Sequence, residues 1–310
     1  MRVVFIGSSE IAIPSLEKLL NSSNHDVVTI ISQKDKPAGR RKKLSSTSLK
    51  SFASSKGLSV FTPDSISSSI TYDFLKNIVF DILVIVGYGQ FIPNEIIKLG
   101  KFKAINLHPS LLPQYRGASP IQYSLLNGDK KTGISIIEVI DKMDAGNIIL
   151  QKKIDIDCED NYSTLHDKLA ILGSTVLIEA LNNIENNCVN VNVQDNTKAT
   201  YTKKISKKDG LIDWMDSAEN IYNKIRAYNP WPGCYSFLPT GERMTIWKAS
   251  ITSAEGSPGL IVSDKLIIAT GTKSLSILEL QIAGKKKMDI NSFLNGNKIS
   301  KNQKMIINKN

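Results

Sequence analysis

The sequence is poor in the residues that build disulfide frameworks and metal sites, and it has no long apolar stretch. Its three cysteines, Cys158, Cys188 and Cys234, lie far apart and form no CxxC pair. This spacing argues against a disulfide framework and against a structural zinc site, and it fits a reducing cytosol. No run reaches 18 apolar residues, so we expect no membrane span.

The first residues also lack the features of a targeting segment. Met1–Gly7 contains no basic stretch followed by a long apolar one, and it is not rich in serine and arginine. We therefore expect neither a secretory signal nor a transit peptide, and we expect a cytoplasmic protein.

Patterns of covalent catalysis and of dinucleotide binding are missing as well. There is no G-x-S-x-G elbow, which disfavours a covalent serine nucleophile. Gly7-Ser-Ser-Glu10 has one of the three glycines of the dinucleotide fingerprint, so it predicts a tight strand-to-helix turn rather than NAD binding. Of the three histidines, His25 is expected to be a surface residue and His166 a structural or surface one, which leaves His108.

Charge is unevenly placed along the sequence. The formal net charge is +10, of which residues 1–196 carry +1 and residues 197–310 carry +9. A basic second part is typical either of a lysine-rich solvated surface or of a nucleic-acid-binding appendage on a catalytic domain. Asn182–Thr202, rich in short polar residues, is predicted to be a linker with a short strand at Val189–Val193.

In the first part, β-branched apolar runs alternate with segments of helical spacing. This predicts an α/β fold whose parallel sheet is covered on both faces. The predicted strands are Val3–Ile6, Val27–Ile31, Phe80–Val86 and Ala104–His108, with further β-rich runs at Ile134–Val139 and Ile148–Ile154. Helices are predicted at Ile11–Leu20 and from a loose capping box at Thr164 onward. Ligands of such sheets bind outside the carboxyl ends of the strands.

One segment places polar side chains together at such a strand end. Asn106, His108 and Ser110 are two residues apart, so in an extended chain they share one face. The asparagine and histidine form a donor pair that could stabilise an oxyanion on a carbonyl under attack. An aspartate on a nearby loop could orient the histidine or accept a proton, and Asp141 and Asp144 are the candidates by placement.

A series of motifs extends this constellation along nearly the whole chain. They are Asn106-Leu-His108-Pro-Ser-Leu-Leu-Pro113, Tyr115-Arg-Gly117-Ala-Ser-Pro-Ile-Gln122, Met143-Asp144-Ala-Gly146, Asp35-Lys-Pro-Ala-Gly39-Arg40, Lys204-Ile-Ser-Lys-Lys-Asp209-Gly, Ile212-Asp-Trp214, Ile221-Tyr-Asn-Lys-Ile-Arg226-Ala-Tyr-Asn-Pro-Trp231-Pro-Gly233 and Gly284-Lys-Lys286. Together they resemble the folate-dependent formyltransferases. The later motifs matter because single-domain members of that family lack this part.

The resemblance implies roles for residues at matching positions. It implies that Asn106, His108 and Asp144 are the catalytic trio. It implies folate contacts from Ser110, Leu111, Leu112 and Pro113, and a pterin pocket lined in part by Gly87, Tyr88 and Gly89. The implied formyl donor is 10-formyltetrahydrofolate, used as a co-substrate without a metal.

A tRNA substrate is implied as well. The formyl group would go to the α-amino group of initiator methionyl-tRNA, for translation initiation. The ten residues from Lys34 to Lys43 hold six basic side chains, and the matching loop of the family reaches the tRNA acceptor region. We therefore expect tRNA contacts from Arg40, Arg41, Lys42 and Lys43, and we expect a monomer.

The implied architecture is a Rossmann-like, mostly parallel sheet domain followed by a small OB-like β-barrel. We place the formyltransferase catalytic domain at 1–189, a linker at 190–206 and a basic tRNA-binding domain at 207–310. A barrel of that class suits nucleic-acid binding in its own right. The tryptophans of the second part are expected to pack in its core: Trp214, Trp231 and Trp247.

Two other functions stay open from the sequence. The first is a formyltransferase or 10-formyltetrahydrofolate hydrolase that acts on a small-molecule amine or on water. The second is a non-catalytic RNA-binding protein with a retained enzyme-like domain, and the presence of Asn106, His108 and Asp144 together argues against it. The basic second part favours tRNA over a small substrate.

Overall fold

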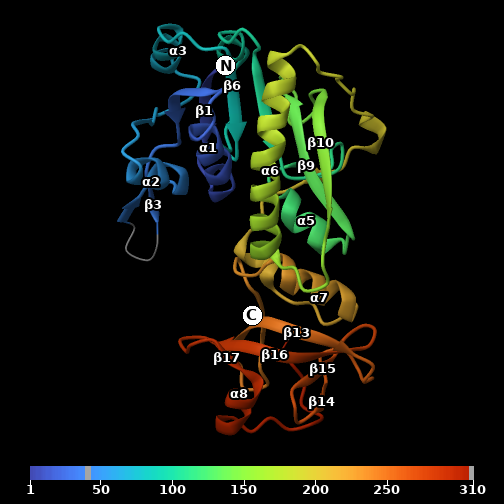
Figure 1. Cartoon of the computed structure of the whole chain (residues 1–310). Helices are drawn as coiled ribbons and strands as arrows, with labels where there is room; N and C mark the ends of the chain where they lie inside the picture. The colour runs from blue at the N-terminus through green and yellow to red at the C-terminus, as the bar shows by residue number, and fades with distance from the viewer. Residues whose placement is uncertain (39–42, 307–310) are drawn as a thin grey trace. The chain divides into compact units, whose positions relative to one another are not determined.

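The structure is a computed structural model that describes residues 1–38 and 43–306 (Figure 1). The chain divides into two compact units, each drawn from separated segments. Unit 1 comprises Met1–Pro120, Lys131–Asp155 and His166–Thr202, and unit 2 comprises Ile121–Lys130, Ile156–Leu165 and the described residues from Lys203 onward. The domain boundaries that we placed at 189 and 206 stay a prediction.

Unit 1 is built on a sheet whose inner strands are apolar on both faces. β6 (Ile82–Val86), for example, is buried along its whole length. The strand order is β10-β9-β7-β6-β1-β2-β5; neighbours from β7 to β5 run parallel, and β9 runs antiparallel to both β7 and β10. The other strands are β1 (Arg2–Gly7), β2 (Asp26–Ile31), β5 (Val60–Phe61), β7 (Ala104–His108), β9 (Lys131–Glu138) and β10 (Ile148–Asp155). The predicted α/β class with a mostly parallel sheet is confirmed.

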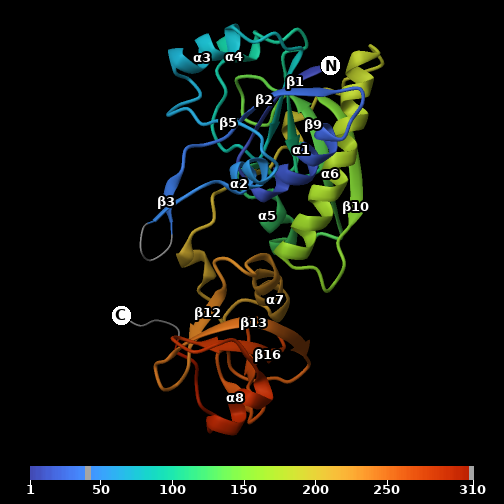
Figure 2. The same cartoon turned by 60° about the vertical axis from the view of Figure 1, so that its left-hand side comes forward.

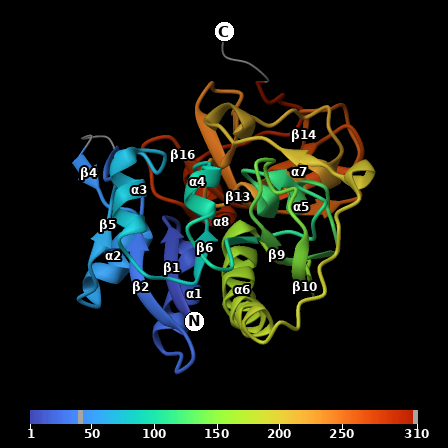
Figure 3. The same ribbon diagram turned by 90° about the horizontal axis from the view of Figure 1, so that it is seen from above.

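Helices lie on both faces of this sheet (Figure 3). Their bounds are α1 (Ile13–Leu20), α3 (Ser69–Lys76), α4 (Asn94–Ile97) and α6 (Tyr162–Glu185). α1 and α6 share one face, where the Lys18 ammonium donates to the Thr175 hydroxyl at 2.7 Å. α3 and α4 lie on the other, over an apolar cluster that includes the sheet residues Ile6 and Ile85. Burial on both faces explains why these strands are continuously apolar.

The long helix α6 begins with a reciprocal cap. The side-chain oxygen of Asn161 accepts from the Thr164 backbone N–H at 3.2 Å, and the Thr164 hydroxyl accepts from the Asn161 backbone N–H at 3.0 Å. Both bonds satisfy N–H groups that a helix N-terminus leaves without partners. The capping residue that we predicted at Thr164 was therefore placed three positions too late.

His25 is buried, so the prediction of a surface position was wrong. Its Nε2 lies 3.0 Å from Oδ1 of Asn182 in α6, and its Nδ1 has no hydrogen-bond partner among the described residues. Burial lowers the pKa of His25, and the N-terminal ammonium of Met1 lowers it further. Polar neighbours in the sequence indicated a surface turn, but α6, far along the chain, packs beside the ring.

Short elements connect the strands of unit 1. β3 (Lys36–Ala38) and β4 (Lys43–Ser45) pair as an antiparallel ribbon. The others are η1 (Glu10–Ala12), α2 (Ser48–Ser55), β8 (Arg116–Gly117), η2 (Asn196–Lys198) and β11 (Tyr201–Thr202), and α5 (Pro120–Leu126) starts at the end of a unit 1 segment. Where we predicted a strand at Val189–Val193, Asn192 makes an isolated bridge with Ile148.

Unit 2 is a small antiparallel barrel (Figure 2). Its strands follow the order β12-β13-β16-β15-β14, with β17 beside β16. The outer strands are joined by the segment 302–306: the Ile306 N–H donates to Phe237 in β12 at 3.0 Å, and the Met305 N–H donates to Gly259, just before β14, at 2.8 Å. Closure gives partners to edges that an open sheet would expose, and the predicted OB-like barrel class is confirmed.

The strands of unit 2 range from two residues in β17 to ten in β13. The bounds of the elements of this unit are η3 (Lys207–Gly210), α7 (Ala218–Ala227), β12 (Cys234–Phe237), β13 (Arg243–Thr252), β14 (Ile261–Ser263), β15 (Ile267–Ala269), β16 (Ser274–Ile282), β17 (Met288–Asp289) and α8 (Ile290–Gly296). α7 packs against β13, and α8 packs against β16 and β17.

The tryptophans differ in burial. Trp214 is fully buried, and its Nε1–H donates to the Ser236 hydroxyl at 2.9 Å, which confirms a core position. Trp247 is half-buried. Trp231 is 49% exposed, so its predicted core position was wrong. Its size favoured burial, but it stands in a proline-rich turn, and turns lie on protein surfaces.

Charge counted by compact unit differs from charge counted along the sequence. Unit 1 carries 21 basic and 16 acidic side chains and unit 2 carries 18 and 13, so each has a net charge of +5. The acidic segment Ile156–Leu165, which precedes the split at Asn196, accounts for part of the change. Both units therefore attract polyanions. Within the described residues, no helix is long and apolar enough to cross a membrane.

Candidate active site

The candidate catalytic residues stand on β7 and on the loop between β9 and β10. Asn106 and His108 are two residues apart in β7, so they face the same side of the sheet. β9 runs antiparallel to β7, and its last residue, Glu138, pairs with Ile105. The loop of residues 139–147 therefore turns back along the sheet to bring Asp144 beside both side chains.

Asp144 contacts both partners through different oxygens. Its Oδ1 accepts from the Asn106 amide at 3.5 Å, and its Oδ2 lies 3.6 Å from Nδ1 of His108. The Gly117 backbone N–H donates to the same Oδ2 at 2.8 Å. The side chains of His108 and Asp144 are 5% and 14% exposed, so the groups meet where little water reaches them. Asp141, the other candidate, instead accepts from Asn94 at 2.6 Å.

One nitrogen of His108 is committed to the backbone. Nε2 lies 2.9 Å from the carbonyl oxygen of Tyr115. Because a carbonyl oxygen only accepts, Nε2 carries a proton and donates it there. Nδ1 is therefore the nitrogen that faces Asp144, at 3.6 Å from its Oδ2. That separation is longer than a hydrogen bond, so a proton on Nδ1 is not committed to the carboxylate.

Two residues that the sequence analysis missed hold the Asp144 loop. The Gln194 amide nitrogen donates to the carbonyl oxygens of Asp144 at 2.8 Å and of Gly146 at 2.7 Å. The Gln194 side-chain oxygen accepts from Nε and Nη2 of Arg116 at 3.1 and 2.8 Å. Gln194 and Arg116 are 5% and 2% exposed. Gln194 fell in the predicted linker, and Arg116 stood in a motif without an assigned role.

The segment that we predicted to contact folate follows β7 and is held by internal hydrogen bonds. Ser110 is fully buried, and its hydroxyl donates to the Gln114 carbonyl at 2.6 Å. Leu112 is buried, whereas Leu111 and Pro113 are half-buried. These contacts fix the shape of the segment beside His108. Its binding of folate stays a prediction.

The turn after β6 presents backbone rather than side chains. Gly87 and Gly89 have φ angles of 56° and 76°, a region that favours glycine. A Cβ on Gly87 would stand 2.1 Å from the Ser9 hydroxyl. The Tyr88 side chain points into the apolar cluster with α3 and α4, and burial raises its pKa to about 12. A pterin contact from this turn would therefore come from the backbone.

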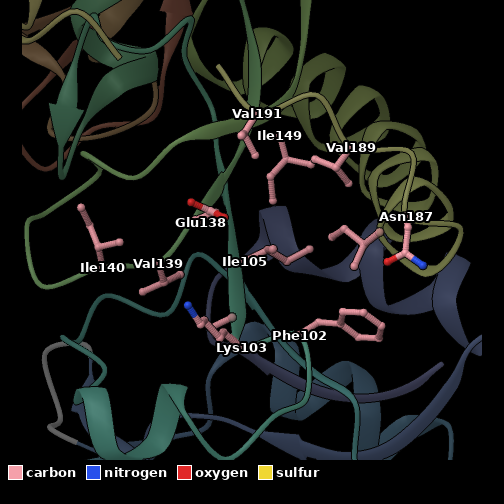
Figure 4. Close-up of a pocket in the computed structure, with 12 residues that line it drawn as sticks. Phe102, Lys103, Ile105, Glu138, Val139, Ile140, Ile149, Asn187, Val189 and Val191 are labelled. Atoms are coloured by element: carbon pink, nitrogen blue, oxygen red, sulfur yellow. The ribbon is translucent and has the colours of Figure 1, made fainter. Parts of the chain in front are cut away.

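A cavity of about 380 Å³ lies beside the same strands (Figure 4). Ile105 and Glu138 line it together with Val189 and Val191. Because side chains alternate along a strand, Ile105 points away from the face that carries Asn106 and His108. None of the predicted trio lines this cavity, so it is separate from the catalytic constellation.

The predicted tRNA-binding segment is described only at its flanks. Arg40, Arg41 and Lys42 lie outside the described residues, and Lys43 is placed by its backbone in β4. Lys34, at the start of the segment, forms an ion pair with Asp64, in the loop before α3. Within the described residues, no group of three or more His, Cys, Asp or Glu side chains could hold a metal ion.

Both parts of the chain match one known family. Residues 1–181 match the formyl transferase family, and residues 204–298 match the formyl transferase C-terminal domain. The chain belongs to the formyl transferase family. Asn106, His108 and Asp144 all fall within the first match.

Curated relatives of this formyl transferase extend over almost its whole length. The methionyl-tRNA formyltransferase of Alkaliphilus oremlandii (strain OhILAs) is 39% identical over 306 residues, which cover 97% of this chain and 98% of the relative. That of Bacillus subtilis (strain 168) is 38% identical over 303 residues, which cover 95% of this chain and 94% of the relative. The resemblance seen in the motifs is thus confirmed over the full length.

Solved structures share the fold of this formyl transferase. The N-formyltransferase of Helicobacter canadensis, in complex with folinic acid and dTDP-3-aminofucose, has a TM-score of 0.67 at 19% identity and covers 92% of this chain and 99% of its own. HypX of Aquifex aeolicus, in complex with tetrahydrofolic acid, has a TM-score of 0.64 at 16% identity and covers 95% of this chain and 47% of its own. These likenesses show the fold of the chain.

Proposed function

We propose that this formyl transferase moves a formyl group from 10-formyltetrahydrofolate to the α-amino group of initiator methionyl-tRNA, for translation initiation. The observation that carries the proposal is the joint contact of Asp144 with Asn106 and His108. It occurs in a chain that is 39% identical, over nearly its whole length, to a curated methionyl-tRNA formyltransferase.

The residues around the trio fit a folate as the formyl donor. Gly87 and Gly89 leave backbone exposed at the end of β6, and Phe91 just beyond presents its ring to solvent. Met143, next to Asp144, is also exposed. Exposed apolar and aromatic side chains beside a few fixed polar groups suit a planar ring system. We assign the pterin to Gly87–Gly89 and further folate contacts to Ser110–Pro113.

Asn106 and His108 supply donors for the charge that develops in the reaction. As the methionyl amine attacks, negative charge gathers on the oxygen of the formyl carbon. The Asn106 amide makes only a 3.5 Å contact with Asp144. Its N–H can therefore form a shorter hydrogen bond to the formyl oxygen. The second donor is Nδ1–H of imidazolium His108, because Nε2–H is committed to the Tyr115 carbonyl.

Asp144 orients both donors, and its carboxylate is placed to accept the proton that the amine loses. The new bond joins the amine nitrogen to the formyl carbon, and the bond between that carbon and the folate nitrogen breaks. The proton lost by the amine must reach the folate nitrogen. Asp144 can accept it and pass it on, directly or through water. No covalent enzyme intermediate is required.

The test is a formyl-transfer assay with charged initiator tRNA and 10-formyltetrahydrofolate. We expect His108→Ala and Asp144→Asn each to lower kcat by about a hundredfold or more, because each removes charge stabilisation or proton transfer. Binding of tRNA, measured by filter retention, should change little, since neither side chain is part of the basic surface.

Three results would contradict this proposal. Near wild-type turnover in either variant would refute the assigned roles. Formylation of a sugar amine or of free methionine, with charged tRNA untouched, would favour a small substrate. Release of formate from the folate without any acceptor would favour a hydrolase.

We propose that the tRNA contacts residues 40–43, which follow β3 in the sequence and reach into β4. Arg40, Arg41, Lys42 and Lys43 would bind its acceptor region, and the barrel of unit 2 would bind its backbone. The net charge of +5 on each unit supports contacts from both. A monomeric state and a cytoplasmic location stay predictions.

A further inference from the structure

Asp144 is held in an unusual backbone conformation. Its φ angle is 50°, in the left-handed region that non-glycine residues adopt uncommonly. Contacts with surrounding residues can hold a residue in such a conformation. The surroundings here include Gln194, whose amide donates to the carbonyl oxygens of Asp144 and Gly146.

The orientation of the Gln194 amide follows from its partners. Arg116 carries only donors, so the end of the amide that faces it must be the oxygen. The opposite end, which faces two carbonyl oxygens, must then be the NH₂ group. Arg116 thus turns both amide hydrogens of Gln194 toward the Asp144 loop. Asn196 and Tyr201 hold the guanidinium in turn, through contacts of 2.9 and 3.3 Å with its nitrogens.

Arg116 also lies between the two backbone groups that contact the catalytic side chains. The carbonyl of Tyr115 accepts from His108, and the N–H of Gly117 donates to the Asp144 carboxylate. Asp144 is therefore held twice from the same stretch of chain. Its carboxylate is held by Gly117, and its carbonyl is held by the Arg116 side chain through Gln194.

We infer that Gln194 and Arg116 are positioning residues of the formyl-transfer reaction, which set the backbone of Asp144 so that its carboxylate meets His108 and Asn106. Neither touches the reacting atoms. The inference rests on the proposed function, because it concerns the same site. It assigns a positioning role to a residue from the polar segment between the two family matches, residues 182–203.

The test is Gln194→Glu. This change keeps the oxygen that accepts from Arg116 and removes the NH₂ group that donates to the Asp144 loop. The new carboxylate still accepts from Arg116, and more strongly, so the contact between these two side chains is kept. It has no hydrogens for the carbonyls of Asp144 and Gly146, and it repels them. Because a misplacement of about 1 Å can cost a hundredfold in rate, we expect kcat to fall at least tenfold. The KM values for charged tRNA and for the folate should stay within about threefold.

The matched control is Asn190→Asp, which adds the same charge at an exposed position four residues away. Its kcat should equal that of the wild type. A second measurement places Gln194→Glu in an Asp144→Asn background under single-turnover conditions. If Gln194 acts through Asp144, the second change should slow the reaction less than twofold, whereas a general structural role would slow it as much as in the wild-type background.

The outcomes separate the two proposals. A wild-type chain that does not formylate charged tRNA refutes the proposed function. A wild-type chain that does so, with Gln194→Glu within twofold of its kcat, refutes the positioning role alone. An equal loss of rate in the Asp144→Asn background refutes it as well. Should the glutamate prevent folding, Gln194→Met keeps the length of the side chain without the charge. A kcat within twofold of the wild type, or an equal loss of rate in the Asp144→Asn background, would then refute the positioning role.

Discussion

At the scale of single residues, hydrogen-bonding capacity determines what each group near the site can do. Tyr115 offers His108 only an acceptor, so Nε2 donates to it and Nδ1 is the nitrogen that faces Asp144. His25, on the α6 face of the sheet, shows the opposite situation. It is buried with one ring nitrogen lacking a partner among the described residues, and burial followed by the N-terminal ammonium lowers its pKa. Burial thus favours the neutral form of His25, whereas His108 is held through Nε2 by the Tyr115 carbonyl.

The lowered pKa of His25 predicts a pH-dependent stability. The unfolded chain takes up a proton at the ordinary histidine pKa of about 6.5, whereas the folded chain resists it. The contribution of neutral His25 is therefore complete above about pH 6.5 and is lost as the pH falls below it. We expect the urea midpoint of the wild type to fall more between pH 7.5 and 5.5 than that of His25→Gln, which still donates to Asn182. Equal falls would contradict this.

Sequence reasoning reached the trio because spacing along a strand is local information. Asn106 and His108 share a face by alternation alone, and Asp144 followed from its loop and its motif. Gln194 could not be found in this way, since its partners Arg116 and Asp144 lie 78 and 50 residues away. No periodicity marks a side chain whose role depends on contacts across three segments.

At the scale of elements, apolar runs predicted the central strands to within a few residues, because buried parallel strands leave few choices of side chain. The ends of elements were less predictable. The box predicted at Thr164 shares only that residue with the observed cap, in which Asn161, three positions earlier, is the capping residue. The return of the loop 139–147 along the sheet was also unpredictable, because it depends on β9 running antiparallel to β7.

The cap of α6 predicts a measurable change in stability. Asn161→Ala removes the acceptor for the Thr164 N–H and should lower the free energy of unfolding by about 1 kcal/mol. Asn161→Asp keeps an acceptor at this position and should stay close to the wild type. Urea titrations followed by circular dichroism compare the three proteins. An alanine variant as stable as the aspartate variant would show that the cap contributes nothing.

At the scale of the whole molecule, the compact units do not follow the order of the sequence. The split at Asn196 assigned nearly all the excess charge to the second part, but each unit has a net charge of +5. Ile121–Lys130 and Ile156–Leu165 return to unit 2, and only tertiary contacts could show this. A polyanion as large as a tRNA is thus offered basic surface by both units rather than by an appendage alone.

This charge distribution predicts a strong effect of salt on tRNA binding. Contacts with several phosphates release counterions, and six to ten of them cost about 10³–10⁵-fold in affinity between 50 and 200 mM salt. We expect the Kd for charged tRNA to rise at least tenfold over that range, and the KM for the folate to change less than about threefold. A Kd for tRNA that is flat with salt would rule out phosphate contacts as its main source.

The alternation of side chains along β7 has a consequence for genetics. Ile105 lines the cavity and Leu107 packs on Gly173 of α6, whereas Asn106 and His108 face Asp144. Neighbouring codons therefore carry different kinds of allele. We expect changes at positions 105 and 107 to weaken folding and to give conditional phenotypes that low temperature rescues. Under the proposed function, we expect changes at 106 and 108 to lower activity at every temperature. Along this strand, phenotype alternates with the pleat.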